Sequence, residues 1–437
     1  MLNDESLLEI SEIEFSEKYP LNKGQKGIIE EVITWKTQPP LVKTGRSSFL
    51  IIDEDKLPFK GMKIKGCGFF DTFNHTAMQP SKDEGYEAHM QHAPDGVKEI
   101  HYQIEVDDND ELIYTVPKQR PYGAQNYDQA VKEYNAYETL EKNWKGDPEK
   151  YPFYYPIAFA KYKDMENEGN PLGVGVFGMR TQSEMMLGPY FAGQFEDKGL
   201  RINPQLLEYW QKNIAKVGQH EPDYFDILLT LQNLAREFGK SLSHLHEHFV
   251  DHDSHLFNCA VDNESGVVMI YDLDHVIEAD KISDQKYFYY CIKDFEIALV
   301  AVMSNFLLNG LMYGIPLFKD LNKQIDEFNV VKGLYEGYFG ELSKDAEYYV
   351  KALWKRLVLA AVNSLIDTDQ KEHLPIVYAF CENEREQSYL DLFPFLKEKI
   401  NKVRPDFDMK FEEHEKIIKK FLNQKTELSK EHNVTPQ

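Results

Sequence analysis

The stretch that most constrains the fold spans residues 251–275 and reads DHDSHLFNCAVDNESGVVMIYDLDH. Its two runs of β-forming residues, NCAV and VVMIYD, are separated by the turn-forming residues DNESG. Gly266 ends that turn and can adopt the positive φ that a tight connection requires, so the stretch predicts a β-hairpin. Five Asp, three His and two Asn lie on and around the hairpin. A rigid hairpin would hold these polar side chains in fixed positions.

The rest of the chain changes character along its length. β-forming runs dominate the first half, and residues 127–144 form its first strong helical pattern. From about residue 203 the patterns are helical, with long predicted helices at 222–249, 295–313 and 346–366. The predicted strands are 47–55, 62–70, 99–106, 111–116, 153–163 and 172–180. We therefore expect an α+β fold with two lobes. The expected units are an N-terminal extension (1–45), a β-rich lobe (46–182), a helical lobe (183–425) and a polar tail (426–437).

Composition limits the possible partners. The formal net charge is −24, which disfavours binding to nucleic acids and to anionic membrane surfaces. The longest apolar run, residues 295–318, contains Glu296, Asn305 and Asn309 and predicts a buried helix rather than a membrane span. The four cysteines form no CxxC pair, and the first twenty residues lack the apolar core of a signal peptide. We expect a cytoplasmic protein with free thiols.

Three residues of the constraining stretch have the spacing of a phosphoryl-transfer site. Asp253 and Asn258 precede the first strand, and Asp272 follows the second. Phosphoryl transfer needs a carboxylate near the incoming hydroxyl and oxygen ligands that hold Mg²⁺ against the nucleotide phosphates. The three side chains supply these groups if the hairpin brings them together.

This pattern of Asp, four residues, Asn, strand, turn, strand and Asp resembles the protein-kinase-like superfamily, and the aminoglycoside phosphotransferases in particular. The resemblance implies ATP and Mg²⁺ as cofactors, Asp253 as catalytic base, and Asn258 and Asp272 as metal ligands. The chain departs from the pattern of this superfamily at two positions. Asp251 replaces the usual histidine two residues before the base, and no glycine follows Asp272, so Asp274 is an alternative metal ligand.

The same resemblance implies a strand lysine that orients the phosphates and pairs with a helix glutamate. Glu133 is the expected glutamate, and Lys65 is favoured over Lys118 as the lysine. Lys65 lies in KGCG, and Glu133 lies in AVKEYNAYETL. Both segments are similar to segments of the selenoprotein-O family, kinase-like enzymes that transfer AMP to proteins.

Two further residues are expected to support the site. Asp294 precedes the apolar run, and the resemblance implies that it opens a helix and braces the catalytic loop through backbone N–H groups. His252 is expected to support the same loop. Arg180 ends a predicted strand; an ordinary surface arginine is favoured there, and contact with phosphate is the alternative.

Three classes of function remain open from the sequence. The first is an ATP- and Mg²⁺-dependent transferase that moves a phosphoryl group, or alternatively AMP, to a hydroxyl of a protein or small molecule. The second is a kinase-like nucleotide-binding or scaffold protein without turnover. The third is a zinc hydrolase, suggested by five histidines within twelve residues: His244, His246, His248, His252 and His255.

Overall fold

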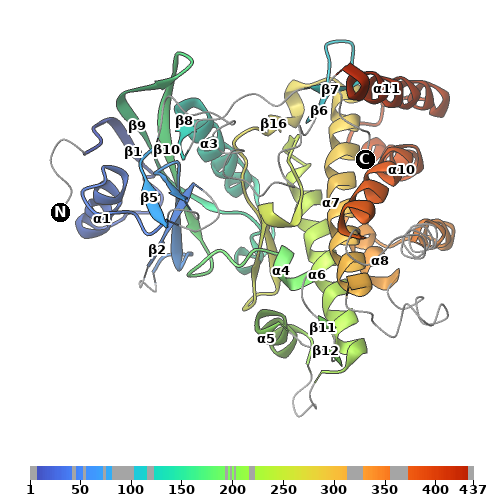
Figure 1. Cartoon of the computed structure of the whole chain (residues 1–437), viewed down its shortest axis with the longest axis horizontal. Helices are drawn as coiled ribbons and strands as arrows, with labels where there is room; N and C mark the ends of the chain where they lie inside the picture. The colour runs from blue at the N-terminus through green and yellow to red at the C-terminus, as the bar shows by residue number, and fades with distance from the viewer. Residues whose placement is uncertain are drawn as a thin grey trace.

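The computed structural model describes residues 7–41, 46–52, 56–71, 75–80, 103–115, 123–191, 195–196, 199–200, 203–215, 222–312, 328–354 and 373–431. Figure 1 shows a β-rich part, built from the first half of the chain, beside a helical part built from the second half. The expected α+β class is therefore confirmed, with an antiparallel main sheet.

The main sheet has six strands in the order β1-β9-β10-β3-β2, and β8 pairs with β10. Every pairing in it is antiparallel, and β9 and β10 form its long central hairpin. The sheet strands are β1 (Ile10–Phe15), β2 (Ser47–Ile51), β3 (Gly61–Lys65), β8 (Gln125–Asn126), β9 (Tyr155–Asn167) and β10 (Asn170–Met179).

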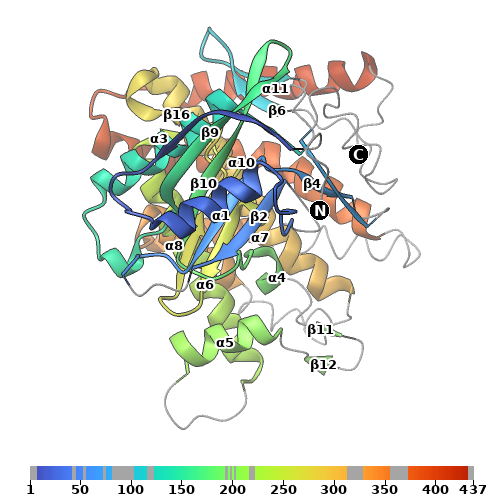
Figure 2. The same cartoon turned by 90° about the vertical axis from the view of Figure 1, so that its left-hand side faces the viewer.

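Two helices cover opposite faces of this sheet, α1 (Lys23–Ile33) and α3 (Tyr127–Asn143). Because side chains alternate along a strand, β9 directs Phe159 toward α3, where it contacts Tyr134. It directs Tyr162 toward α1, where the hydroxyl donates to the Ile33 carbonyl. Figure 2 looks onto the outer face, with α1 in front of the strands. The segment expected to be an N-terminal extension thus supplies β1 and α1 to the sheet and its cover.

The helical part is built around α6 (Tyr224–Leu245) and α7 (Asp284–Met312). Helix α6 packs on α8 (Phe328–Phe339) so closely that a Cβ added at Gly239 or Gly337 would collide with backbone atoms of the other helix. Glycine therefore permits the close backbone contact between these helices. The other helices described in this part are α4 (Gly188–Phe191), α5 (Pro204–Asn213), α10 (His373–Val403) and α11 (Phe411–Glu431), with short 3₁₀ turns at η4 (Leu256–Asn258) and η5 (Ala279–Lys281). A further 3₁₀ turn, η3 (Pro148–Lys150), connects α3 to β9 in the β-rich part.

Small hairpins complete the fold. The expected hairpin of the constraining stretch is confirmed, with β14 pairing β15 and Gly266 at φ 74° in the turn. The β6–β7 hairpin reaches the helical part, where Tyr114 stacks on Phe421 of α11 with ring centroids 4.2 Å apart (Figure 1). The small strands are β4 (Phe69–Asp71), β5 (Thr76–Met78), β6 (Gln103–Val106), β7 (Leu112–Thr115), β11 (Phe195–Glu196), β12 (Gly199–Leu200), β13 (Phe249–Val250), β14 (Cys259–Asp262), β15 (Val267–Ile270) and β16 (Ile277–Glu278).

Two expected boundaries differ from the structure. Helix α7 begins at Asp284 rather than at Asp294, because Ser283 accepts the Lys286 backbone N–H and starts the helix ten residues earlier. Helix α11 continues past residue 425 to Glu431. Among the described residues, no helix combines the length and apolarity needed to cross a membrane.

Candidate active site

Strand β3 and helix α3 bring Lys65 and Glu133 together. Lys63 and Lys65 are two residues apart on β3, so both point to the face of the sheet that α3 covers. Lys65 Nζ lies 2.8 Å from Glu133 Oε2, and both side chains are buried. Gln125 Nε2 also donates to Glu133 at 3.1 Å, so the carboxylate is held from two sides.

The turn after β15 adds two more carboxylates to the same ammonium group. Asp272 contacts Lys65 Nζ, and Asp274 Oδ2 lies 3.1 Å from it. Asp272 has φ 69°, a left-handed conformation that is uncommon outside glycine and directs its carboxylate back toward β3. The Leu273 backbone N–H donates to Glu133 at 3.2 Å, which fixes the turn against α3. We call Lys65, Glu133, Asp272 and Asp274 the Lys65 cluster.

The two aspartates of this cluster have different environments. Asp274 is fully buried and also contacts Arg46 at 3.1 Å and His275 at 3.0 Å. The side chain of Asp272 is 22% exposed, and the charged partner that the structure gives it is Lys65. Asp272 is therefore the carboxylate that a ligand can reach, whereas Asp274 is enclosed by three cationic or titratable partners.

The charges of the cluster perturb one another strongly. Burial would lower the pKa of Lys65, but Asp272, Asp274 and Glu133 raise it above its ordinary value, so the ammonium stays charged. Burial would raise the pKa of Asp272, but Lys65 lowers it well below its usual range. Burial raises the pKa of Glu133, and the nearby Asp274 and Asp272 raise it further, which together outweighs the lowering by Lys65.

These carboxylates are the described residues most suited to a metal ion. Carboxylate oxygens of Glu133, Asp272 and Asp274 all lie within 4.8 Å of one another. Hard divalent cations such as Mg²⁺ prefer oxygen ligands of this kind. The five histidines that suggested zinc form no such group with the described residues. Instead His246 bonds to Tyr338 and Asp294, and His244 bonds to Glu247.

The loop 251–258 places Asp253 and Asn258 beside the hairpin. Asn258 Nδ2 donates to the Asp253 carbonyl at 2.8 Å, and the Asn258 carbonyl accepts the Tyr271 backbone N–H at 3.1 Å. Asn258 therefore lies beside Tyr271, the residue that precedes Asp272. The Asp253 side chain is 53% exposed and lies 3.5 Å from His255 Nε2. Among the described residues, no hydrogen bond or ion pair joins the Asp253 carboxylate to the Lys65 cluster.

Asp294 and His252 hold this loop in place. The His252 backbone N–H donates to Asp294 Oδ2 at 2.9 Å, although Asp294 lies inside α7 rather than at its start. His252 Nε2 lies 2.8 Å from the Tyr271 carbonyl, which can only accept, so Nε2 carries the proton. Burial raises the pKa of Asp294 to about 6 and lowers the pKa of His252 to about 4.

Several charged residues near the site were not anticipated from the sequence. Arg46 contacts Asp274 from 228 positions earlier in the chain, and nothing in its local sequence indicates that contact. Lys63 lies 2.7 Å from Glu184 and 4.0 Å above the Tyr271 ring. The sequence did contain a signal for Lys63, because it lies two residues before Lys65 and alternate residues of a strand share a face. Asp251 pairs with the buried Lys293. The alternative lysine, Lys118, lies outside the described residues.

No protein-family model matches the chain, and no curated protein matches its sequence.

Proposed function

We propose that the protein is an ATP- and Mg²⁺-dependent transferase with the two-lobed arrangement of protein-kinase-like enzymes. The observation that carries the proposal is the Lys65 cluster. A strand lysine, a helix glutamate and an aspartate after a hairpin meet at one point, from three separate parts of the chain. Protein kinases use this combination of residue types and elements to orient phosphates and metal.

The residues have distinct proposed roles. Lys65 would bind the nucleotide phosphates while Glu133 holds its side chain, and Asp272 with Asn258 would hold Mg²⁺. The bound ion would neutralise charge on the phosphates. Asp253, exposed on its loop, would accept the proton of the attacking hydroxyl. For Lys65 to reach a phosphate, its contact with Asp272 must be replaced by a contact between Asp272 and the ion.

The transferred group and the acceptor are further parts of this proposal. Phosphoryl transfer is favoured because Asp253 provides a carboxylate base, and AMP transfer is the alternative. The acceptor hydroxyl would belong to a protein or a small molecule. With a net charge of −24, the chain favours the approach of neutral or cationic acceptors over anionic ones.

A second candidate is a nucleotide-binding or scaffold protein without turnover. The direct contact between Lys65 and Asp272 favours it, because neither charge is available to a phosphate or an ion while the two are paired. Asp251, which replaces the usual histidine of the family, is itself neutralised by Lys293. This candidate predicts nucleotide binding with no transfer to any acceptor.

The test is incubation with Mg²⁺ and ATP, read by intact mass. Many such transferases modify themselves, so a gain of one phosphate or of one AMP would identify the transferred group. The Asp253→Ala variant should lose that gain, and the matched Asp280→Ala variant, which removes an exposed aspartate on η5, should keep it. Equal gains in all three proteins would rule out Asp253 as the base. Calorimetry with ATP would separate a silent binding protein from one that binds no nucleotide.

A further inference from the structure

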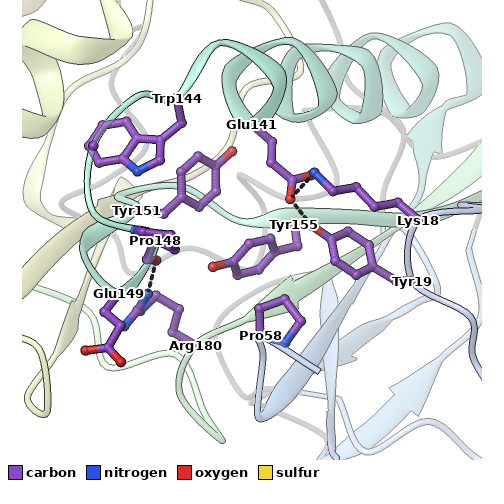
Figure 3. Close-up of a pocket in the computed structure, with 11 residues that line it drawn as sticks. Lys18, Tyr19, Pro58, Glu141, Trp144, Pro148, Glu149, Tyr151, Tyr155 and Arg180 are labelled. Carbon is purple, nitrogen blue, oxygen red and sulfur yellow. Dashed lines mark hydrogen bonds and ion pairs between the residues drawn. The ribbon is translucent and has the colours of Figure 1, made fainter. Parts of the chain in front are cut away.

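A cavity opens on the β-rich part, at the C-terminal end of α3. It has a volume of about 520 Å³, and its walls come from the end of α3, the start of β9, the end of β10 and the loop after β1 (Figure 3). This volume falls in the range of ~300–1,000 Å³ that is typical of sites for small molecules. None of the residues of the Lys65 cluster lines it.

Four aromatic side chains line the cavity: Tyr19, Trp144, Tyr151 and Tyr155. Tyr151 and Tyr155 are buried beneath the cavity, with their ring centroids 5.1 Å apart. Trp144 lies 5.8 Å from Tyr151 in an edge-to-face arrangement, and Tyr19 lies 5.7 Å from Tyr155. Figure 3 shows the four rings in succession, from Trp144 through Tyr151 and Tyr155 to Tyr19. Such a surface presents π faces that attract flat apolar groups and cations.

One carboxylate in this wall has a replaceable cationic partner. Glu141, on α3, is 13% exposed and accepts a hydrogen bond from the Tyr19 hydroxyl. Its cationic partner is Lys18 at 2.7 Å, whose side chain is 59% exposed. Because the Lys18 side chain is mostly exposed, its ammonium regains contact with water when another cation takes its place on Glu141.

The other cation of the cavity is fixed. Arg180 was expected to be a surface arginine, but its side chain is 14% exposed. Its Nε donates to Asp262 at 2.9 Å and its guanidinium donates to the Pro148 carbonyl at 2.9 Å. With Arg180 neutralised by Asp262, the carboxylates that remain for a cationic ligand are Glu141 in the wall and the exposed Glu149 at its edge. The net charge of the chain also favours a cation over an anion.

We propose that this cavity binds a small organic amine with a flat apolar body. The ammonium group replaces Lys18 on Glu141, and the body lies against Tyr155 and Trp144. Cation and ring contacts at a partly desolvated site reinforce each other, because the aromatic faces carry negative charge density. The site is independent of the proposed transferase activity.

The test is isothermal titration calorimetry of the full chain with 2-phenylethylammonium, and with 2-phenylethanol as the neutral isostere. The ammonium compound should bind at least about tenfold more tightly than the alcohol, because the alcohol cannot pair with Glu141. Glu141→Gln, which keeps an acceptor for Tyr19, should remove this preference. Lys18→Ala should tighten binding by about threefold, because it removes the internal competitor.

A matched variant shows whether tighter binding in Lys18→Ala comes from the loss of a competitor for Glu141 or only from the loss of one positive charge. Lys23→Ala removes an exposed lysine of α1 and should leave binding unchanged. Tightening in Lys18→Ala alone supports the proposal. Absence of binding to the unmodified chain, equal binding of the alcohol, or weaker binding after Lys18→Ala would each overturn it. Circular dichroism of each variant confirms that the fold is retained.

Discussion

Asp272 and Asp274 lie two residues apart and contact the same ammonium group of Lys65, but they are not equivalent. The Asp272 side chain is 22% exposed and the Asp274 side chain is fully buried. Arg46 and His275 also bind Asp274. Asp272 is therefore the aspartate that a ligand can reach, and Asp274 is enclosed by its partners.

Asp272→Asn and Asp274→Asn should consequently separate binding from stability. Asp272→Asn should weaken Mg²⁺-dependent ATP binding by at least about tenfold and should lose less stability than Asp274→Asn, because Glu133 and Asp274 still neutralise Lys65. Asp274→Asn should lose about 3–5 kcal/mol, because it leaves the partly buried Arg46 without its carboxylate partner and removes one of the carboxylates around Lys65. Calorimetry with ATP and urea unfolding measure the two effects. Loss of stability in Asp272→Asn alone would reverse the assignment.

Lys65→Met should be among the most destabilising single changes in the chain. It leaves three carboxylates close together without their ammonium, which should cost about 3–5 kcal/mol in urea unfolding at pH 7. Glu133→Gln should cost less, because Asp272 and Asp274 still neutralise Lys65. The double variant should be more stable than the sum of the single losses predicts, because the second change removes one of the unpaired charges. Strict additivity would mean that the two side chains do not interact.

Asp294 and His252 predict opposite effects of pH on stability. Burial raises the pKa of Asp294 to about 6, so its favourable contribution is fully present below about pH 4 and is lost as the pH rises through about 6. Burial lowers the pKa of His252 to about 4, so its contribution is fully present above about pH 6.5 and is lost as the pH falls through about 4. In the unmodified protein the two effects partly cancel.

Removing either group should expose the effect of the other. Compared with the unmodified protein, Asp294→Asn should lose about 1–2 kcal/mol more stability on going from pH 7 to pH 5. His252→Gln should show the opposite difference, of similar size. Urea unfolding at both pH values measures it. If both variants kept the pH dependence of the unmodified protein, neither pKa shift would be present.

Tyr114 and Phe421 should couple the β6–β7 hairpin to α11. Their rings stack 4.2 Å apart with an interplanar angle of 15°. A double-mutant cycle of the two alanine variants should give a coupling energy of about 0.5–1.5 kcal/mol in urea unfolding. A coupling energy near zero would show that the contact between the two rings adds nothing to the stability of the protein.

The sequence predicted the elements better than their contacts. The hairpin around Gly266 and the helix 127–144 were predictable, because turn chemistry and apolar spacing are local signals. The beginning of α7 was missed, because the apolar run that defined the prediction starts well inside the helix. The capping residue, Ser283, was the local signal for its true start.

The candidate site was predictable in part for the same reason. Short spacings indicated Asp253, Asn258 and Asp272, and the choice of Lys65 rested on resemblance. Arg46 and Lys293 could not be predicted, since their partners depend on how distant segments pack. Arg180 was misjudged because its partner, Asp262, lies 82 residues later.

The members of the Lys65 cluster lie far apart in the sequence, and this separation determines the order in which they can meet. Asp272 and Asp274 follow Lys65 by 207 and 209 residues. During synthesis, Lys65 and Glu133 leave the ribosome long before either aspartate, so Glu133 is the first partner available to the lysine. Contacts this distant in sequence close late, after the loop-closure entropy of the intervening chain has been overcome. A nascent chain that ends before residue 272 therefore carries half of the cluster, and the complete set of charges first exists when both parts of the molecule have emerged and docked.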